Sequence, residues 1–265
     1  MIKKIALLLT VIIILSTFNL HTFANTEIFN WYCKRTKDHT QPIADKSLEF
    51  VTEYGGYYVD KNHGNDCADK VIYLTFDAGY ENGNVAKVLD ALKEENVKAT
   101  FFILDLLLFK NLDLVNRMIS EGHTVANHTA KHSDVSRISS KEELQAEISD
   151  LETLFKEKTG KEMPKYFRPP EGKFSLQSMK YAHELGYKTI FWSFAYADWD
   201  NGNQMSPAAA KTKIMDNIHN GAVLLLHPTS ETNALILADV IRELKGQGFR
   251  FGTMDELTQT NNEKL

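Results

Sequence analysis

The sequence predicts an α/β fold, a distorted (β/α)7 barrel of the incomplete TIM-like type, in a single domain with an irregular N-terminal extension. The first reason is that seven short apolar stretches each precede a stretch with helical spacing, and this alternation implies parallel strands with helices outside. The second is that no glycine-rich phosphate loop follows the first strand, which disfavours a nucleotide-binding open sheet. The third is that the seven units follow one another with no internal linker, although 265 residues with 43% hydrophobic content would by length suffice for one large domain or two small ones.

Residues 1–24 have the pattern of a targeting segment that is not part of the fold. Lys3 and Lys4 precede an almost unbroken apolar run from Ile5 to Leu15, and a small-residue cleavage site follows at Thr22-Phe23-Ala24. This order is typical of an export signal. The run is shorter than the ~20 apolar residues of a membrane span, and the open alternative is that the segment stays uncleaved as an N-terminal anchor.

Residues 25–70 form an irregular extension that we expect to wrap the barrel. Its Gly55-Gly56 pair suggests a turn between two short strands. Cys33 and Cys67 are the two cysteines of the chain, and in an exported protein such a pair favours a disulfide that ties the extension to the barrel. Two unpaired thiols are the alternative. A net charge of -5 with scattered lysines gives no indication of a nucleic-acid partner.

The barrel is expected over residues 71–258, with a tail at 259–265. Its first strand is the stretch 71–79, because five of its first six residues are β-branched or aromatic. Asn84 can cap the helix that follows over 85–96, where apolar residues recur at helical spacing.

The remaining elements repeat this alternation, and their helices tend to begin at hydroxyl or proline residues and to end at glycine. Further strands are expected at 99–104, 124–128, 166–170, 188–193, 222–227 and 249–253. Further helices are expected at 112–121, 139–158, 175–185, 207–219 and 233–245, with a short one from 254.

Polar side chains stand where five of these strands end. They are Asp77, His128, Arg168, His227 and, after the fifth strand, Asp198 with Trp199. The carboxyl ends of parallel strands meet on one rim, which is where chemistry occurs in such folds. An Asp before Gly is also an ordinary turn residue, but the gathering of all these side chains favours an enzyme over that reading.

His128 and His132 are four positions apart, which places both imidazoles on one face of a helical turn. Two imidazoles with that reach suit a divalent transition metal, Zn²⁺ above all. The structural alternative is one surface histidine and one buried, hydrogen-bonded histidine. The position of the pair at a strand end near Asp77 favours the metal.

These residues resemble the five motifs of the polysaccharide deacetylases of the nodulation-factor deacetylase type, carbohydrate esterase family four. The motifs appear in order as Thr75-Phe76-Asp77-Ala78-Gly79, His128-Thr129-Ala130-Lys131-His132, Arg168-Pro169-Pro170-Glu171-Gly172, Asp198-Trp199 and Leu225-Leu226-His227. They span about residues 71–254. Within the family, Tyr80-Glu81-Asn82-Gly83 and the loop 194–199 look most like the delta-lactam-forming peptidoglycan deacetylases of spore formers.

The resemblance implies a role for each motif residue. Asp77 would be the general base that takes a proton from the attacking water, and Arg168 would pair with Asp77. His227 would protonate the leaving amine, and Asp198 would hold its imidazole. His128 and His132 would bind the metal, while Trp199, Tyr80, Glu171 and Leu225 would contact the substrate. Plain core packing is the alternative for Trp199.

Two departures from the family pattern matter. Ala78 stands where the family has an Asp that binds the metal, so the resemblance implies that divalent metal, Zn most of all, is bound weakly or labilely. Glu171 stands where the family has Tyr. The family uses the backbone N–H of this residue to hold the oxyanion, so a side-chain change is tolerated.

The expected function is metal-assisted de-N-acetylation of N-acetylmuramic acid in peptidoglycan, leading to muramic delta-lactam in spore cortex. The partner would be the glycan strand after an amidase has removed the peptide stem. The protein would act outside the cytoplasm, in the cell wall or the forespore intermembrane space, with membrane contact only through an uncleaved N-terminal segment. The alternatives are a deacetylase of N-acetylglucosamine polymers and a catalytically weakened glycan-binding homologue.

Overall fold

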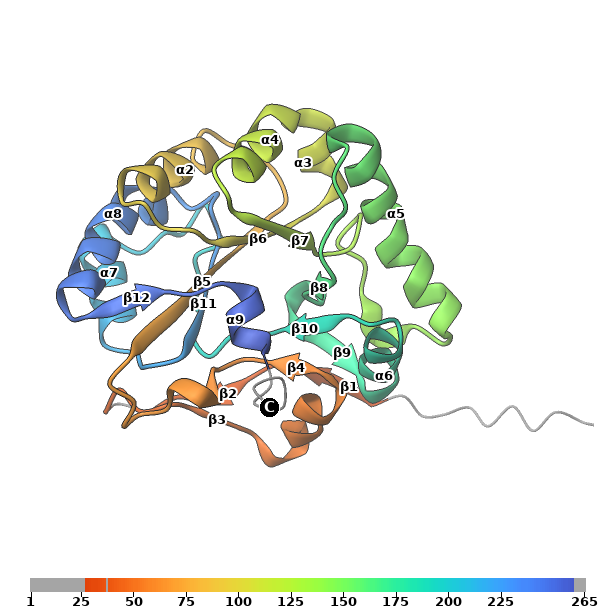
Figure 1. Cartoon of the computed structure of the whole chain (residues 1–265), viewed down its shortest axis with the longest axis horizontal. Coiled ribbons are helices and arrows are strands. Elements are labelled where there is room, and N and C mark those ends of the chain that lie inside the picture. The colour runs from red at the N-terminus through yellow and green to blue at the C-terminus, as the bar shows by residue number, and fades with distance from the viewer. Residues whose placement is uncertain (1–26, 37, 260–265) are drawn as a thin grey trace, which may run out of the picture.

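The computed structural model describes residues 27–36 and 38–259, so the predicted export signal and nearly all of the predicted tail lie outside the described residues. Figure 1 shows a ring of strands with most of the helices on its outside. Within the described ranges, no helix combines the length and apolar character required to cross a membrane.

All seven predicted strands are present and run parallel, which confirms the distorted (β/α)7 barrel. The main sheet follows the order β11-β5-β6-β7-β8-β10-β4, with β12 paired to the start of β5. Its predicted strands are β5 (Lys70–Ala78), β6 (Thr100–Ile103), β7 (Thr124–Asn127), β8 (Tyr166–Phe167), β10 (Lys188–Ile190), β11 (Ala222–Leu226) and β12 (Phe249–Phe251). Between the β10–β4 end and β11, isolated bridges join Val59 to Ala222 and Phe194 to Leu224.

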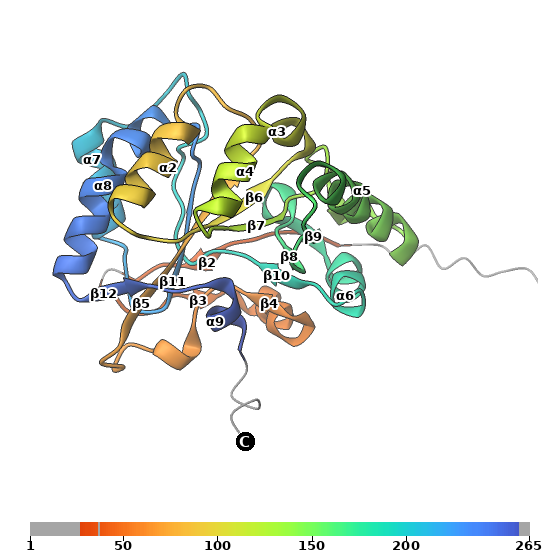
Figure 2. The ribbon, with the colours of Figure 1, turned by 45° about the horizontal axis from the view of Figure 1, so that its top comes forward.

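Helices cover the outer face of the sheet (Figure 2). They are α2 (Val85–Glu94), α3 (Asp105–Lys110), α4 (Leu112–Ser120), α5 (Lys141–Thr159), α6 (Leu176–Glu184), α7 (Pro207–Met215) and α8 (Glu231–Gly246). The short helix α9 (Met254–Thr258) instead packs Met254 and Leu257 in the cluster inside the barrel. Helix α3 was not predicted, because its leucines continue the apolar run of β6. Helix α7 ends at Met215, four residues before its predicted end at His219. Beyond the helix, the buried Asn220 accepts a hydrogen bond from the backbone N–H of Val71 at 2.8 Å.

The alternation of side chains along β5 creates the polarity of the site. Phe76 and Ala78 pack in the cluster between sheet and helices, whereas Val71 and Tyr73 pack in the cluster inside the barrel. Successive residues of a strand point to opposite faces, so Thr75 and Asp77 continue the inward row. The inward row therefore changes from apolar to polar toward the C-terminal end of the strand.

The N-terminal extension is more ordered than predicted, and part of it belongs to the barrel sheet. Strand β1 (Ile28–Asn30) pairs antiparallel with β9 (Lys173–Ser175), and β2 (Cys33–Lys34) pairs with β3 (Ile43–Ala44). The prediction for Gly55-Gly56 was wrong in detail. Gly55 is the left-handed C-cap of the 3-10 helix at Lys46–Tyr54, and Gly56 begins β4 (Gly56–Tyr57), which pairs parallel with β10.

The predicted disulfide is absent, because Cys33 and Cys67 are both free thiols. The Cys33 thiol lies 3.4 Å from the carbonyl oxygen of Ser193, to which it donates. Burial raises the pKa of Cys33 to about 12, which keeps this thiol protonated and unreactive. Packing, not a covalent bond, therefore holds this part of the extension against the barrel.

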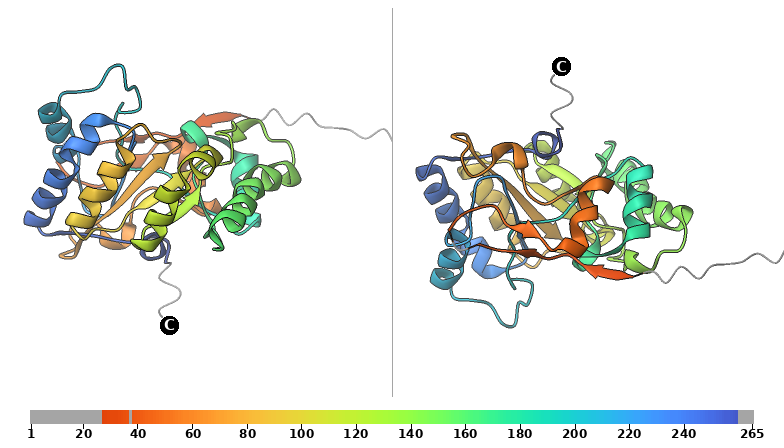
Figure 3. Two further views of the ribbon diagram at one scale, coloured as in Figure 1. Left: turned by 90° about the horizontal axis from the view of Figure 1, so that it is seen from above. Right: turned by 90° about the horizontal axis from the view of Figure 1, so that it is seen from below.

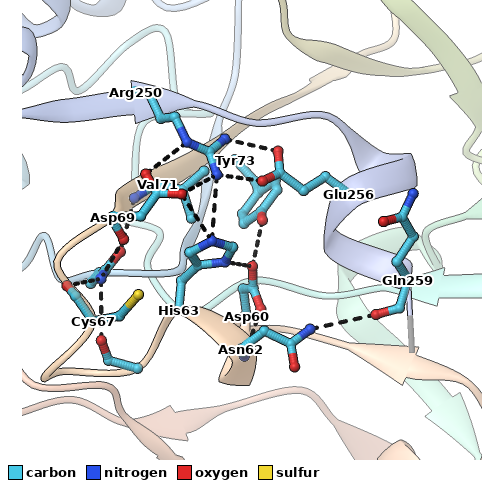
Figure 4. Close-up of polar contacts among 12 residues, drawn as sticks. Asp60, Asn62, His63, Cys67, Asp69, Val71, Tyr73, Arg250, Glu256 and Gln259 are labelled. Atoms are coloured by element: carbon cyan, nitrogen blue, oxygen red, sulfur yellow. Dashed lines mark hydrogen bonds and ion pairs between the residues drawn. The ribbon is translucent and has the colours of Figure 1, made fainter. Parts of the chain in front are cut away.

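A charged cluster closes the N-terminal end of the barrel, around the start of β5 (Figure 4). Arg250 on β12 contacts Asp69 at 2.7 Å through Nη2 and Glu256 at 2.9 Å through Nη1. His63 lies between two carboxylates, with Nδ1 2.6 Å from Asp60 and Nε2 3.2 Å from Asp69. We call Asp60, His63, Asp69, Tyr73, Arg250 and Glu256 the base cluster.

Candidate active site

A cavity of about 600 Å³ lies at the carboxyl ends of the strands. It collects side chains from loops that follow several of them: Asp77, Gly79, Tyr80, Leu104, His128, His132, Glu171, Trp192, Ala195, Tyr196, Trp199, Leu225, His227 and Thr229. The predicted common rim is therefore present. Of the ten predicted site residues, only Arg168 and Asp198 do not line the cavity, and both lie directly behind residues that do.

Asp77 at the end of β5 is the acidic centre of the cavity. Its Oδ1 accepts a hydrogen bond from Arg168 Nη1 at 2.8 Å, and its Oδ2 lies 3.5 Å from His128 Nε2. Burial opposes ionisation of Asp77, but the Arg168 guanidinium, with His128 and His227, outweighs burial and lowers the pKa. Asp77 is thus an ionised carboxylate with one oxygen held by Arg168.

Arg168 is fully buried, and backbone and aromatic groups fix its position. Nε donates to the carbonyl oxygen of Ile190 at 2.9 Å, and Nη2 donates to Thr75 Oγ1 at 2.9 Å. The guanidinium lies 4.2 Å from the ring centroid of Phe102. A buried guanidinium needs this full set of partners, so Arg168 can orient Asp77 without itself reaching solvent.

His227, after β11, faces the cavity with Asp198 behind it. His227 Nδ1 lies 2.7 Å from Asp198 Oδ1, and its backbone N–H donates to Asp198 Oδ2 at 2.8 Å. Burial opposes protonation of His227, but the hydrogen bond and charge of Asp198 outweigh burial and raise the pKa. In the described part of the chain, His227 Nε2 has no hydrogen-bond partner, so it is available to a ligand.

His128 and His132 lie together, although not on a helical turn as predicted. Thr129 (φ 66°) and His132 (φ 60°) adopt left-handed conformations, and these turns of the loop bring the two rings to a centroid distance of 5.1 Å. His128 Nδ1 lies 2.8 Å from the carbonyl oxygen of Arg168, which must be an N–H donor contact and leaves Nε2 as the acceptor. Burial lowers the pKa of His128 to about 4, so its ring is neutral near pH 7.

This pair fits part of a metal site. A neutral imidazole whose other nitrogen is anchored to a carbonyl is the form in which histidine binds metals. The described residues contain no group of three or more His, Cys, Asp or Glu side chains arranged around a common metal position. Ala78 is fully buried in the outer apolar cluster and contributes no ligand atom.

The four predicted substrate contacts form the walls of the cavity. Trp199 is 60% exposed, and its ring lies 6.1 Å from that of His227 at 67°. Tyr80 accepts a hydrogen bond from Asn201 Nδ2 at 2.8 Å. Glu171 has a left-handed φ of 57° and pairs with Lys173 at 2.5 Å. Leu225 is buried, with its edge reaching the cavity.

Sequence reasoning missed the residues that support His227 from behind. Asn233 on α8 donates to Asp198 Oδ2 at 2.6 Å and to the carbonyl oxygen of His227 at 3.2 Å. Tyr196 donates to Asn233 Oδ1. A buried Asn in the apolar face of a predicted helix is the signal that could have indicated this role, because buried amides require partners.

Comparisons with known proteins agree with this geometry. Residues 64–190 match the polysaccharide deacetylase family. The chain is 40% identical over 232 residues to the peptidoglycan-N-acetylmuramic acid deacetylase PdaA of Bacillus subtilis, covering 87% of this chain and 86% of that protein. It is 38% identical over 195 residues to a peptidoglycan-N-acetylglucosamine deacetylase of Bacillus cereus, covering 71% of this chain and 88% of that protein.

The fold comparison gives the same result. The solved structure of Bacillus subtilis PdaA, described as a family 4 carbohydrate esterase, matches with a TM-score of 0.81 at 38% identity, covering 90% of this chain and 99% of that one. The resemblance inferred from the five motifs is therefore confirmed. The chain belongs to the polysaccharide deacetylase family, the family 4 carbohydrate esterases.

Proposed function

We propose that this enzyme hydrolyses the N-acetyl group of N-acetylmuramic acid in peptidoglycan. The observation that supports this most directly is the pairing of Asp77 and His227 in one cavity, with the pKa of the first lowered and that of the second raised. Neighbouring groups whose pKa values are pushed apart suit a base and an acid acting in one reaction.

Asp77 is proposed as the general base. Arg168 holds Oδ1, so the proton of the attacking water is taken by Oδ2, which accepts no hydrogen bond from the described residues. A positioned base of this kind contributes about 10²–10⁴ to the rate. The nearby Arg168 keeps the carboxylate ionised between turnovers.

His227 is proposed as the general acid. Its Nε2 faces the cavity and would give its proton to the amine nitrogen as the C–N bond breaks. Asp198 holds Nδ1 and stabilises the imidazolium, and Asn233 holds Asp198. The products are acetate and a free amine on the sugar.

Deacetylases of this family are metal-dependent. Here His128 and His132 would hold a divalent ion, Zn²⁺ by preference for imidazole, and the ion when bound would polarise the acetyl carbonyl. With two protein ligands in place of the three typical of catalytic zinc, binding would be weak or labile. The backbone N–H of Glu171 would then assist in holding the developing oxyanion.

The substrate assignment rests on the similarity to the peptidoglycan-N-acetylmuramic acid deacetylase PdaA of Bacillus subtilis. We propose that the freed amine condenses with the lactyl carboxyl of the same sugar, with loss of water, to give muramic delta-lactam in spore cortex. Closure requires a lactyl group without its peptide stem, so an amidase would act first. The protein would work outside the cytoplasm after export through residues 1–24, and residues 71–258 would be the catalytic domain.

Mass analysis of defined glycans after incubation with the enzyme tests this assignment. Stem-free muramic glycans are expected to lose the acetyl group of the muramic residue, with added Zn²⁺ raising the rate. Stem-bearing glycans and N-acetylglucosamine oligomers are the matched alternatives. Acetate release from glucosamine alone would overturn the substrate, and binding without release would identify a glycan-binding homologue.

A further inference from the structure

A second depression of about 310 Å³ adjoins the active-site cavity on the far side of Trp199. The loop between β10 and α7 forms most of it, and Trp199 lines both hollows. This loop projects from the face of the molecule opposite to α9 (Figure 3). The volume lies at the lower end of the ~300–1,000 Å³ of small-molecule sites, so it has room for one small ligand unit.

Gln204 lines the second depression and fixes its loop through hydrogen bonds at both ends of its amide. Its Nε2 donates to the carbonyl oxygens of Asp198 at 2.9 Å and Asp200 at 2.8 Å, and its Oε1 accepts from Ser230 Oγ at 2.5 Å. Asp200 Oδ1 is also used within the loop, accepting from the backbone N–H of Gly202 at 2.9 Å. With both ends of the Gln204 amide satisfied, the depression is preformed and is tied to the segment that carries Asp198.

Two polar side chains in this depression are left for a ligand. In the part of the chain that the structure describes, the Asn203 amide makes no side-chain hydrogen bond and Lys213 makes no ion pair. Lys211, two residues earlier on α7, provides the contrast, because it pairs with Glu243 at 2.9 Å. An exposed indole beside a free amide and a free ammonium suits a sugar, which offers an apolar ring face and hydroxyl or carbonyl oxygens.

The depression also continues away from the active site. Met205 and Lys213 line a third, open hollow of about 750 Å³ that extends to Arg35 and Asp216. The second depression thus shares Trp199 with the active-site cavity, and it shares Met205 and Lys213 with the third hollow. We call these three connected hollows the track. The balanced charges along it indicate hydrogen bonding to a polar chain, not capture of a highly charged one.

We propose that this track binds the sugars that flank the reacting sugar on the same glycan strand, with Asn203 and Lys213 contacting the first of them. The inference rests on the proposed function, since it takes the reacting sugar to occupy the cavity at Asp77. Asn203 and Lys213 then determine preference for chain length and take no part in the chemistry.

The test compares kcat/KM for the N-acetylmuramic acid monosaccharide, which has no flanking sugar, with that for a stem-free muramic hexasaccharide. The wild-type enzyme is expected to prefer the hexasaccharide by on the order of tenfold, the worth of one or two net hydrogen bonds. Combining Asn203→Ala with Lys213→Ala should remove most of this preference while changing the monosaccharide kcat/KM by less than about twofold. Lys211→Ala, on the same helix and outside the track, should retain the wild-type preference. An equal loss on both substrates, or no loss on either, would overturn the proposal.

A binding measurement separates this proposal from the proposed function. Calorimetric titration of Asp77→Asn with the hexasaccharide, with and without the two track substitutions, needs no turnover. Weaker binding with the track substitutions supports the track even if wild-type enzyme releases no acetate, in which case only the proposed function fails. Equal binding by both proteins would reject the track.

Discussion

The two ends of the barrel carry similar charged residues, but their hydrogen-bonding atoms are occupied at one end and partly unoccupied at the other. At the base cluster, His63 has a carboxylate at each ring nitrogen, and Arg250 is shared by Asp69 and Glu256. At the cavity, Asp77 and His227 each have one atom held by the protein and one left open within the described residues. The difference teaches that an Asp, Arg and His set indicates catalysis only where its hydrogen-bonding capacity remains incomplete.

The largest effect is expected when the active-site cavity loses the carboxylate of Asp77. Asp77→Asn keeps a hydrogen-bond acceptor for Arg168 but cannot take a proton, so acetate release should fall by about 10²–10⁴. Circular dichroism should remain that of the wild type. Near-wild-type turnover would show that Asp77 is not the base.

The second prediction concerns the pH dependence of activity set by His227, the proposed general acid. His227 has a raised pKa in the folded protein, so the protonated acid is present at lower pH and is lost as pH rises through that value. In Asp198→Asn the cause of the increase is removed while burial remains. The alkaline limb of kcat/KM should move to lower pH, with activity reduced by about 10²-fold. An unmoved limb would show that another group is the acid.

The third prediction concerns the base cluster at the N-terminal end of the barrel. Asp60→Ala removes the acceptor of the buried Tyr73 hydroxyl and one partner of His63, which should cost about 1–3 kcal/mol of unfolding free energy. The melting temperature should fall by roughly 3–10 °C, with kcat of the folded enzyme unchanged. Asp69→Asn, at the exposed edge of the cluster, is the control and should shift stability far less. A loss of kcat in Asp60→Ala would mean that the two ends are coupled.

The smallest expected effect comes from adding a carboxylate at position 78, directly after Asp77. Ala78→Asp restores the carboxylate of the family motif. Because Ala78 packs in the outer apolar cluster, the new carboxylate reaches the ion only if the end of β5 rearranges, and zinc binding should then tighten by about tenfold, within the 10–100-fold worth of even outer-shell partners. Position 78 is fully buried, so the variant without metal should melt below the wild type and recover on addition of zinc. Zinc affinity equal to that of the wild type would mean that position 78 does not face the ion.

The sequence was most informative where periodicity and strand position act together. The repeated strand and helix pattern predicted the barrel, and the ends of β5, β7, β8 and β11 predicted which residues meet at the cavity. These inferences succeed because parallel topology fixes where strand ends lie, whatever the loops do.

Predictions failed where a contact depends on partners distant in the chain. The loop at His128–His132 has helical spacing but takes left-handed turns, and His128 is held by the carbonyl oxygen of Arg168, which is 40 residues away in the chain. Cys33 packs against the backbone of Ser193, which no cysteine count could reveal. Asn233 and Gln204 likewise acquire their roles from Asp198, a residue that neither adjoins in the sequence.

Strand β4 imposes an order on how this chain can assemble. Tyr57 emerges early in synthesis, but its partner in the sheet is Ile190, so the edge strand stays unpaired until most of the barrel has been made. Contacts of such long sequence separation form slowly, because closing a long loop costs entropy before any pairing compensates. Newly made chains therefore keep β4 without its sheet partner until the segment that forms β10 has also been made.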